Sequence, residues 1–282
     1  MHYRPSLRHA RMVLGFSGWM DGGDVSTGTV SFLAQELGAR RLAEIDPERF
    51  YLYNFPGSME LTALFRPHTI IEDGLIAEYQ GPANTLYCSE ENKLILFEGH
   101  EPHLRWGEYA DCLLDVASAC NVRTIYFIGS VAGAVPHTRL PRFHGSVSEK
   151  RLKVLLAEHQ IAPSNYEGPA SFLTYLTRLC CQRGVEMITL VAEVPAYVQG
   201  RNVKCIQAAV AKLSAMLGLA ANLRKLDALR AEFERRIDEM IRERAELRDF
   251  IRKIEKEYDE ETRDTQMDDL KTWFEKQDFP SE

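Results

Sequence analysis

Residues 16–38, FSGWMDGGDVSTGTVSFLAQELG, decide the expected fold, because the hydrophobic pattern changes its period within this stretch. The stretch continues the apolar run Met12–Phe16, which is typical of a strand buried on both faces. Apolar or small residues then recur every four positions, at Val25, Thr29, Leu33 and Leu37. This spacing is that of an amphipathic helix. The stretch therefore predicts a strand, a glycine-rich turn and a helix.

The same alternation continues along the chain. Further apolar runs predict strands at Arg49–Tyr53, Lys93–Glu98, Thr124–Gly129 and Met187–Glu193. Helical patterns separate these runs, one beginning near Tyr109 and one near Phe172. Because crossover helices connect parallel strands, we expect an α/β protein with a central, mostly parallel sheet flanked by helices.

The C-terminal part has a different pattern, without strands and rich in charged residues. Two interleaved rows have a seven-residue period, one with Leu226, Phe233, Met240, Leu247 and Ile254, the other with Leu223, Arg230, Ile237, Arg244, Ile251 and Tyr258. Either a long or hairpinned helix packs on its own body or a sister subunit, or the helix forms a free-standing coiled coil. The two arginines favour the first alternative. We expect an α/β domain over residues 1–221, a helical heptad-bearing extension over 222–258 and an acidic, flexible tail over 259–282.

Composition narrows the class of protein. The 282 residues are 45% hydrophobic, enough for a sizeable core. Residues 257–282 contain ten acidic and three basic residues, which leaves 31 of each in the rest of the chain. This neutral body and acidic tail give no reason to expect a nucleic-acid partner. The apolar runs are too short for a membrane span, and the six cysteines have no disulfide-type spacing. We expect a cytoplasmic protein that does not bind membranes.

Several polar loops follow predicted strands. Because parallel strands place their carboxyl ends on one edge, these loops are expected to wall one crevice there. The candidate crevice residues are Trp19, Asp21, Asp24, Glu98, Glu101, His137 and Arg139. Asp24 is also placed to cap the following helix, and capping is its favoured role. His137 and Arg139 either hold an anionic ligand or belong to an extended arm in which prolines block strand pairing.

Specific catalytic and cofactor motifs are missing from the sequence. The opening loop lacks the G-K-[ST] ending of a P-loop, the G-x-G-x-x-G of dinucleotide-binding proteins and the last glycine of a nucleophile elbow. His100 and His103 lie close together in EGHEPHLRW, but an extended segment would direct them to opposite faces, which is unfavourable for a metal site. We therefore predict no catalytic residues, no metal and no cofactor.

Five motifs in order carry a resemblance to a known family: GFSGWMDGGDVSTG (15–28), EGHEPHLRW (98–106), GSVAGAVPHTRLPR (129–142), YEGPASFLTYL (166–176) and VAEVPAYV (191–198). Their succession resembles the PAC2 family, proteins similar to proteasome assembly chaperone 2, and in particular its longer actinobacterial-type members. The resemblance covers roughly residues 10–220, and the helical C-terminal part is similar to an extension of those longer members. It implies a fold similar to that of the purine nucleoside phosphorylases. It also implies self-association into rings or trimers, and protein binding.

The C-terminal ending and one loop residue depart from this family pattern. Members that engage proteasome core particles can end in a hydrophobic residue, a tyrosine and any residue, whereas this sequence ends in QDFPSE, which argues against docking of its tail into a proteasome ring. Many members have a histidine where this chain has Ala196. A catalytic role at that position would therefore be lost.

The sequence favours a non-enzymatic, protein-binding or assembly-chaperone-like protein that forms a homo-oligomer, with a trimer as one form, and binds an unknown protein client. The alternative is a hydrolase or phosphorylase acting on nucleosides or nucleotides in the crevice, and this alternative rests on analogy of fold alone.

Overall fold

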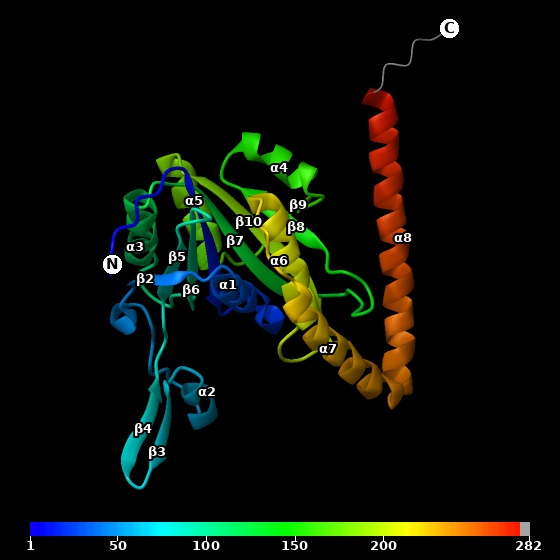
Figure 1. The fold of residues 1–282 in the computed structure, drawn as a ribbon. Helices are drawn as coiled ribbons and strands as arrows, with labels where there is room; N and C mark the ends of the chain where they lie inside the picture. Colours follow the sequence, from blue (N-terminus) through cyan, green and yellow to red (C-terminus); the bar gives the residue numbers. More distant parts are fainter. Residues whose placement is uncertain (277–282) are drawn as a thin grey trace.

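An eight-stranded sheet forms the centre of the molecule (Figure 1). The computed structural model describes the backbone of residues 1–276 and the side chains of residues 1–264. The strand order is β2-β5-β6-β1-β7-β10-β8-β9. The four central strands, β6, β1, β7 and β10, are parallel, and antiparallel neighbours flank them on both sides. The predicted α/β class with a mostly parallel sheet is confirmed.

The elements have the following bounds. The strands of the large sheet are β1 (Ala10–Ser17), β2 (Arg40–Glu44), β5 (Thr85–Ser89), β6 (Leu94–His100), β7 (Val122–Gly133), β8 (Phe143–Val147), β9 (Ala162–Pro163) and β10 (Glu186–Pro195). A separate two-stranded sheet contains β3 (His68–Glu72) and β4 (Leu75–Gln80). The helices are α1 (Val25–Glu36), α2 (Met59–Ala63), α3 (Trp106–Ala119), α4 (Lys153–Glu158), α5 (Phe172–Arg183), α6 (Val203–Leu217), α7 (Arg224–Arg242) and α8 (Ala245–Lys276). Short 3-10 turns are η1 (Gly22–Asp24), η2 (Pro47–Arg49) and η3 (Lys150–Leu152).

Four of the five predicted strands are present, but the strand predicted at Arg49–Tyr53 is wrong. Arg49, the first residue of the predicted strand, belongs to the turn η2 instead. Asp46 caps this turn by accepting a hydrogen bond from the Glu48 N–H. Phe50 and Tyr51 are buried in the core without pairing in the sheet. A short apolar run does not distinguish a strand from a buried connection. The apolar runs did not indicate the shorter strands β2, β3, β4, β5, β8 and β9.

Helices cover both faces of the sheet. On one face, α3 and α5 pack on an aromatic cluster formed by Phe16, Phe97, Tyr109, Phe127 and Phe172. Each of these fully buried rings contributes about 1.5–3 kcal/mol to stability. On the other face, α1 and α6 pack on β1, β7 and β10 and on each other. The predicted helices α1, α3 and α5, together with α6, which was not predicted, therefore enclose the strands that the sequence identified as buried on both faces.

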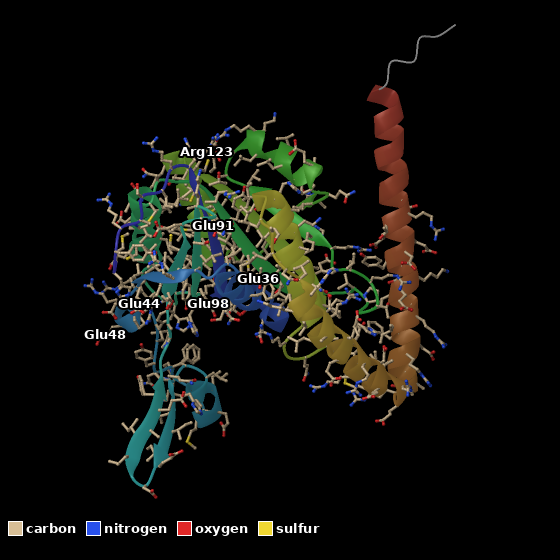
Figure 2. The ribbon with its side chains drawn as sticks, viewed as in Figure 1. Glu36, Glu44, Glu48, Glu91, Glu98 and Arg123 are labelled. Atoms are coloured by element: carbon tan, nitrogen blue, oxygen red, sulfur yellow. The ribbon has the colours of Figure 1, made fainter. Side chains whose placement is uncertain are left out.

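An arm, residues 54–82, projects from the body and carries α2, β3 and β4 (Figure 1). Every residue of β3 and β4 is exposed, and Figure 2 shows their side chains projecting away from the rest of the ribbon. Half of the 18 large exposed apolar side chains in the described part of the chain lie on this arm: Phe55, Met59, Leu61, Leu64, Ile70, Ile71, Leu75, Ile76 and Tyr79. At the arm's base, the Phe65 ring contacts His103 of the body, with ring centroids 5.6 Å apart.

The C-terminal heptads form a helical hairpin that packs on its own body. α7 contacts α6, and Ile237, Ile241 and Ile251 form a small apolar cluster between α7 and α8. Arg230 of the interleaved row is satisfied by hydrogen bonds to Glu234 and Gln207. The structure therefore has a hairpin on the body, one of the forms expected for this extension.

The expected boundary between residues 258 and 259 does not coincide with a helix end. α8 continues across it to Lys276, so that residues 259–276 are helical where a flexible tail was expected. Pairs with the spacing of one helical turn, such as Lys253 with Glu257 and Lys256 with Glu260, support this helix. Residues 277–282 of the expected tail lie outside the described residues. Among the described helices, none combines the length and apolarity that crossing a membrane requires.

Candidate functional site

The glycine-rich loop after β1 is a structured turn held by its neighbours. Ser130 of β7 donates its backbone N–H to Met20 O at 2.8 Å and its hydroxyl to Gly22 O at 2.7 Å. Asn202, at the start of α6, donates its N–H to Gly23 O at 2.8 Å. Gly23 has φ +65°, and a Cβ there would lie 2.8 Å from the Asn202 Cβ, so only glycine fits. The loop is therefore fixed against β7 and α6.

Asp21 caps helix α1, which corrects the role expected for Asp24. The Asp21 carboxylate accepts hydrogen bonds from the Ser26 N–H (2.7 Å), the Thr27 N–H (3.2 Å) and the Thr27 hydroxyl (2.7 Å). Asp24 has φ +52° and makes no side-chain cap. The two glycines delay the start of the helix, which places the earlier carboxylate over the free N–H groups.

Two half-buried carboxylates share this edge. Burial raises the pKa of Glu98, the nearby charge of Asp21 raises it further, and Arg201 lowers it. Burial likewise raises the pKa of Asp21, against the lowering effect of its hydrogen bonds from Thr27 and Ser26. Glu98 lies near the end of β6 (Figure 2). The charge of Asp21 therefore disfavours the charged form of Glu98, whereas the carboxylate that raises the pKa of Asp21 is Asp24.

Glu101 connects the same loop to the beginning of α5. One carboxylate oxygen accepts the Phe172 N–H at 2.8 Å and the other accepts the Trp19 N–H at 3.2 Å. The Trp19 side chain remains 62% exposed. The first group of expected crevice residues, Trp19, Asp21, Asp24, Glu98 and Glu101, thus lies in the segments that follow β1 and at the end of β6.

His137 lies beneath the C-terminal helical hairpin. Its side chain is 5% exposed, and its Nδ1 lies 2.8 Å from the Tyr197 hydroxyl and its Nε2 3.2 Å from Asp238 Oδ1 of α7. Burial raises the pKa of Tyr197 to about 12, so this hydroxyl stays protonated. The Lys204 ammonium donates to the His137 carbonyl and lies 3.0 Å from Glu234 of α7. The sequence did not indicate these partners, which come from the loop after β10 and from the two helices α6 and α7.

Arg139 is paired with the second helix of the hairpin. Its guanidinium donates two hydrogen bonds to Asp259 of α8, at 2.9 and 2.8 Å, and lies 3.8 Å from Glu255. The pKa of Asp259 is lowered by this bidentate pair. An anionic ligand at Arg139 would therefore have to displace a carboxylate of the chain itself.

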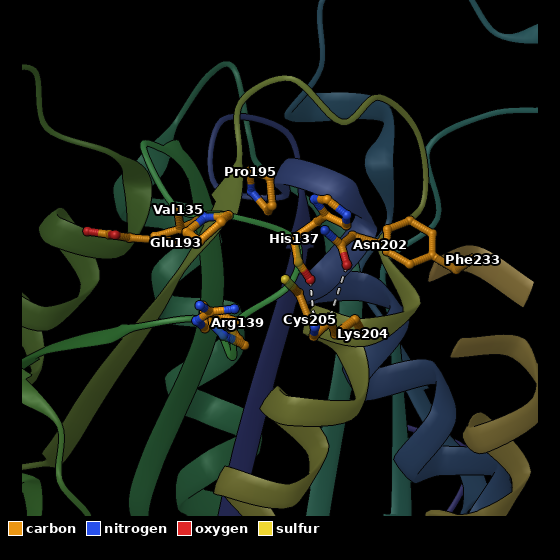
Figure 3. A pocket seen from close by; sticks show the side chains of 11 residues that line it. Val135, His137, Arg139, Glu193, Pro195, Asn202, Lys204, Cys205 and Phe233 are labelled. Carbon is orange, nitrogen blue, oxygen red and sulfur yellow. Dashed lines mark hydrogen bonds between the residues drawn. The ribbon is translucent and has the colours of Figure 1, made fainter. Parts of the chain in front are cut away.

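The two groups of residues lie near the carboxyl edge of the sheet, and Asn202 lies between them. Its N–H binds the glycine loop, and its side chain lines a small cavity with His137, Lys204 and Phe233 (Figure 3). This cavity has a volume of about 10 Å³, room for about one water molecule. As folded, it does not accommodate a nucleoside.

His100 and His103 have other partners. His103 Nδ1 accepts the Leu52 N–H at 3.1 Å, and the His100 carbonyl accepts the Tyr51 hydroxyl at 2.8 Å. Within the described residues, no group of three or more histidine, cysteine, aspartate or glutamate side chains is arranged to hold a metal ion.

The fold that carries this loop and sheet edge has counterparts among known proteins. Residues 15–241 match the model of the PAC2 family. The chain belongs to the PAC2 family. No curated protein matches it.

Solved structures extend this PAC2 assignment. The chain is 29% identical to a Mycobacterium tuberculosis proteasome-assembly chaperone homologue, with a TM-score of 0.74 over 86% of this chain and 99% of the other. It is 26% identical to a PAC2 family protein from Streptomyces avermitilis, with a TM-score of 0.72 and the same coverage. A Mycobacterium tuberculosis protein of unknown function has the same fold, with a TM-score of 0.80, 23% identity and coverage of 92% of this chain and 89% of that one.

A larger groove opens elsewhere on this PAC2 domain. β7, β8 and β10 form its floor, α5 forms one wall, and the loop before α5 and Trp19 complete it. Its volume is about 740 Å³. Of the expected crevice residues, only Trp19 lines it. The sequence did not reveal the groove because its lining residues are dispersed between Trp19 and Val191 and have no common motif.

Proposed function

We propose that this PAC2 protein is a non-enzymatic, assembly-chaperone-like protein that associates with itself and binds a protein client. The family and the Mycobacterium tuberculosis proteasome-assembly chaperone homologue support this role. The unpaired state of all six cysteines supports a reducing compartment, and we place the protein in the cytoplasm.

The observation that carries the proposal is the arm, residues 54–82. A two-stranded hairpin is marginally stable in water by itself, and this one has no cover on either face. Exposed apolar surface of this kind marks a protein interface. An interface is a more direct use for such an arm than catalysis, because every residue of β3 and β4 is exposed.

We assign the arm to self-association. Ile71 and Ile76 are a cross-strand pair, and they are 63% and 70% exposed. A second copy of the chain brings the same apolar side chains, so that two arms packed face to face cover the exposed side chains of both. A closed trimer is one assembly that would satisfy every arm.

The nucleoside-enzyme alternative has weaker support. His137 and Arg139, the groups best suited to an anionic substrate, are held by Asp238 and Asp259 of the hairpin. The cavity beside them takes about one water molecule. Asp21, one of the two acids of the opening loop, is engaged as a helix cap.

Sedimentation velocity at micromolar concentration tests self-association. The native chain is expected to sediment as a multiple of its 32.2-kDa mass, and the double variant Ile71→Lys/Ile76→Lys as a monomer. Val154→Lys and Leu229→Lys are matched controls, because these side chains are 55% and 56% exposed outside the arm. They should leave the mass unchanged. A native chain that sediments as a monomer contradicts the proposed assembly.

A turnover assay tests the non-enzymatic part. Purified protein is incubated with a panel of nucleosides and nucleotides, with and without phosphate and divalent metal. We expect no product above the background. Turnover that disappears in folded Asp21→Asn or His137→Ala would overturn the proposal in favour of the enzyme alternative.

A further inference from the structure

The groove between α5 and the sheet has the size of a small-molecule site. Its volume of about 740 Å³ lies within the range of about 300–1,000 Å³ that encloses drug-sized ligands. It is distinct from the small cavity at His137, which shares none of its lining residues. The groove also lies apart from the arm, whose residues do not line it.

The lining is apolar with a few fixed polar groups. Phe127, Val131, Leu173 and Val191 supply apolar surface. Two exposed aromatic side chains, Trp19 (62%) and Tyr166 (67%), also line the groove. Exposed aromatic rings in a concave site bury large area at low entropic cost when a ligand binds.

The polar groups of the floor are already paired. The Ser146 and Thr189 hydroxyls lie 2.5 Å apart on adjacent strands. His144 Nε2 lies 2.8 Å from Glu193 Oε1. An apolar ligand can therefore cover this floor without leaving these side chains unsatisfied.

Among the described arginine, lysine, aspartate and glutamate residues, Arg178 is the only one that lines the groove. No aspartate or glutamate lines it, although the chain has 41 acidic against 34 basic residues. Arg178 of α5 lines it and, within the described part of the chain, has no hydrogen-bonding or carboxylate partner. By contrast, Arg183 of the same helix donates to Asp111 at 2.6 Å. An unpaired guanidinium beside apolar surface is complementary to an apolar ligand with one anionic group.

We propose that this groove binds a small amphipathic carboxylate, its apolar body between the sheet floor and the rings of Trp19 and Tyr166, and its carboxylate at Arg178. This binding function is separate from the proposed self-association, because it uses neither the arm nor the hairpin.

Isothermal titration calorimetry with decanoate tests the proposal on the full-length protein. Decan-1-ol has the same apolar body without the charge, and acetate has the charge without the body. We expect one decanoate site per chain, about tenfold weaker binding of decan-1-ol and no measurable binding of acetate.

Three variants locate the site. Arg178→Gln should weaken decanoate binding about tenfold, to the level of decan-1-ol, and Arg183→Gln should leave it unchanged. Thr174→Trp, a change at an exposed position of α5 that lines the groove, should block both ligands. Circular dichroism confirms that each variant is folded.

The inference is overturned if the native protein binds no decanoate, if Arg178→Gln and Arg183→Gln bind it equally, or if folded Thr174→Trp binds it like the native protein. Each of these results is independent of sedimentation, so that failure here leaves the proposed assembly untouched.

Discussion

The carboxylate of Glu101 accepts the Phe172 N–H at 2.8 Å, at the first residue of α5. Its second oxygen accepts the Trp19 N–H. One side chain therefore satisfies a free donor at a helix start and fixes the loop that follows β1. Because α5 and Trp19 both line the groove, this carboxylate connects two parts of the groove lining.

Removing this connection should destabilise the protein. Glu101→Ala leaves two backbone donors without their acceptor, and we expect a loss of about 1–3 kcal/mol in the free energy of unfolding. Urea denaturation measures it. Glu108→Ala, which removes an exposed partner of Arg105, is the control and should cost at most about 1 kcal/mol. Equal losses in the two variants would show that Glu101 does not act as this connection.

The helix cap distinguishes Asp21 from Asp24. Asp21→Ala removes the acceptor of the Ser26 and Thr27 donors and should cost about 0.5–2 kcal/mol. Asp24→Gly should be neutral or stabilising, because Asp24 has φ +52° and no cap to lose. Thermal melts of both variants check this order. The prediction fails if Asp24→Gly is the more destabilised of the two.

The raised pKa of Glu98 predicts that its negative charge lowers the free energy of unfolding and that the size of this loss depends on pH. Because the folded-state pKa lies above the unfolded value of 4.5, the folded state binds more protons just above that value. The contribution of Glu98 to stability is thus present at low pH and is lost as pH rises through the folded-state pKa. Glu98→Gln should therefore gain stability relative to the native protein between pH 4 and pH 7.

Urea denaturation at several pH values measures this difference. Glu91→Gln, a change at an exposed position beside β6, serves as the control for loss of one negative charge. A difference between Glu98→Gln and the native protein that stays constant with pH would contradict the raised pKa.

Arginine side chains on the segment before β8 fasten the helix α8. Arg139 binds Asp259, and Arg142 lies 2.6 Å from Glu261 with its guanidinium 4.1 Å from the centre of the Tyr258 ring. The double variant Arg139→Ala/Arg142→Ala should speed amide hydrogen exchange in α8 more than in α3. High salt should have a similar, weaker effect, because these pairs are partly exposed.

The control for α8 is Arg183→Ala, which breaks the exposed pair with Asp111 on the other side of the molecule. It should leave exchange in α8 unchanged. If the double variant also leaves it unchanged, the helix is held by apolar packing of Ile251 and Ile254 alone.

Some features of this protein follow from local patterns. The run Met12–Phe16 and the four-residue spacing after it specify β1 and α1, because a strand buried on both faces and an amphipathic helix each have a hydrophobic period that is visible over a few residues. The order of five weak motifs was sufficient to indicate the PAC2 family. Local pattern failed at Phe50 and Tyr51, which are apolar because they are buried and not because they form a strand.

Other features of this protein depend on contacts between residues that are far apart in the sequence, and only the tertiary structure revealed them. Asp21 and not Asp24 caps α1, because β7 and Asn202 hold the glycine turn in place. His137 and Arg139 are held by carboxylates about 100 and 120 residues further along the chain, and no short-range spacing encodes such pairs. The arm and the groove were also invisible, since exposure is a property of the folded surface. The sequence by itself determined the periodic elements, because their hydrophobic periods are local, whereas the positions of charged and exposed side chains depended on how those elements pack.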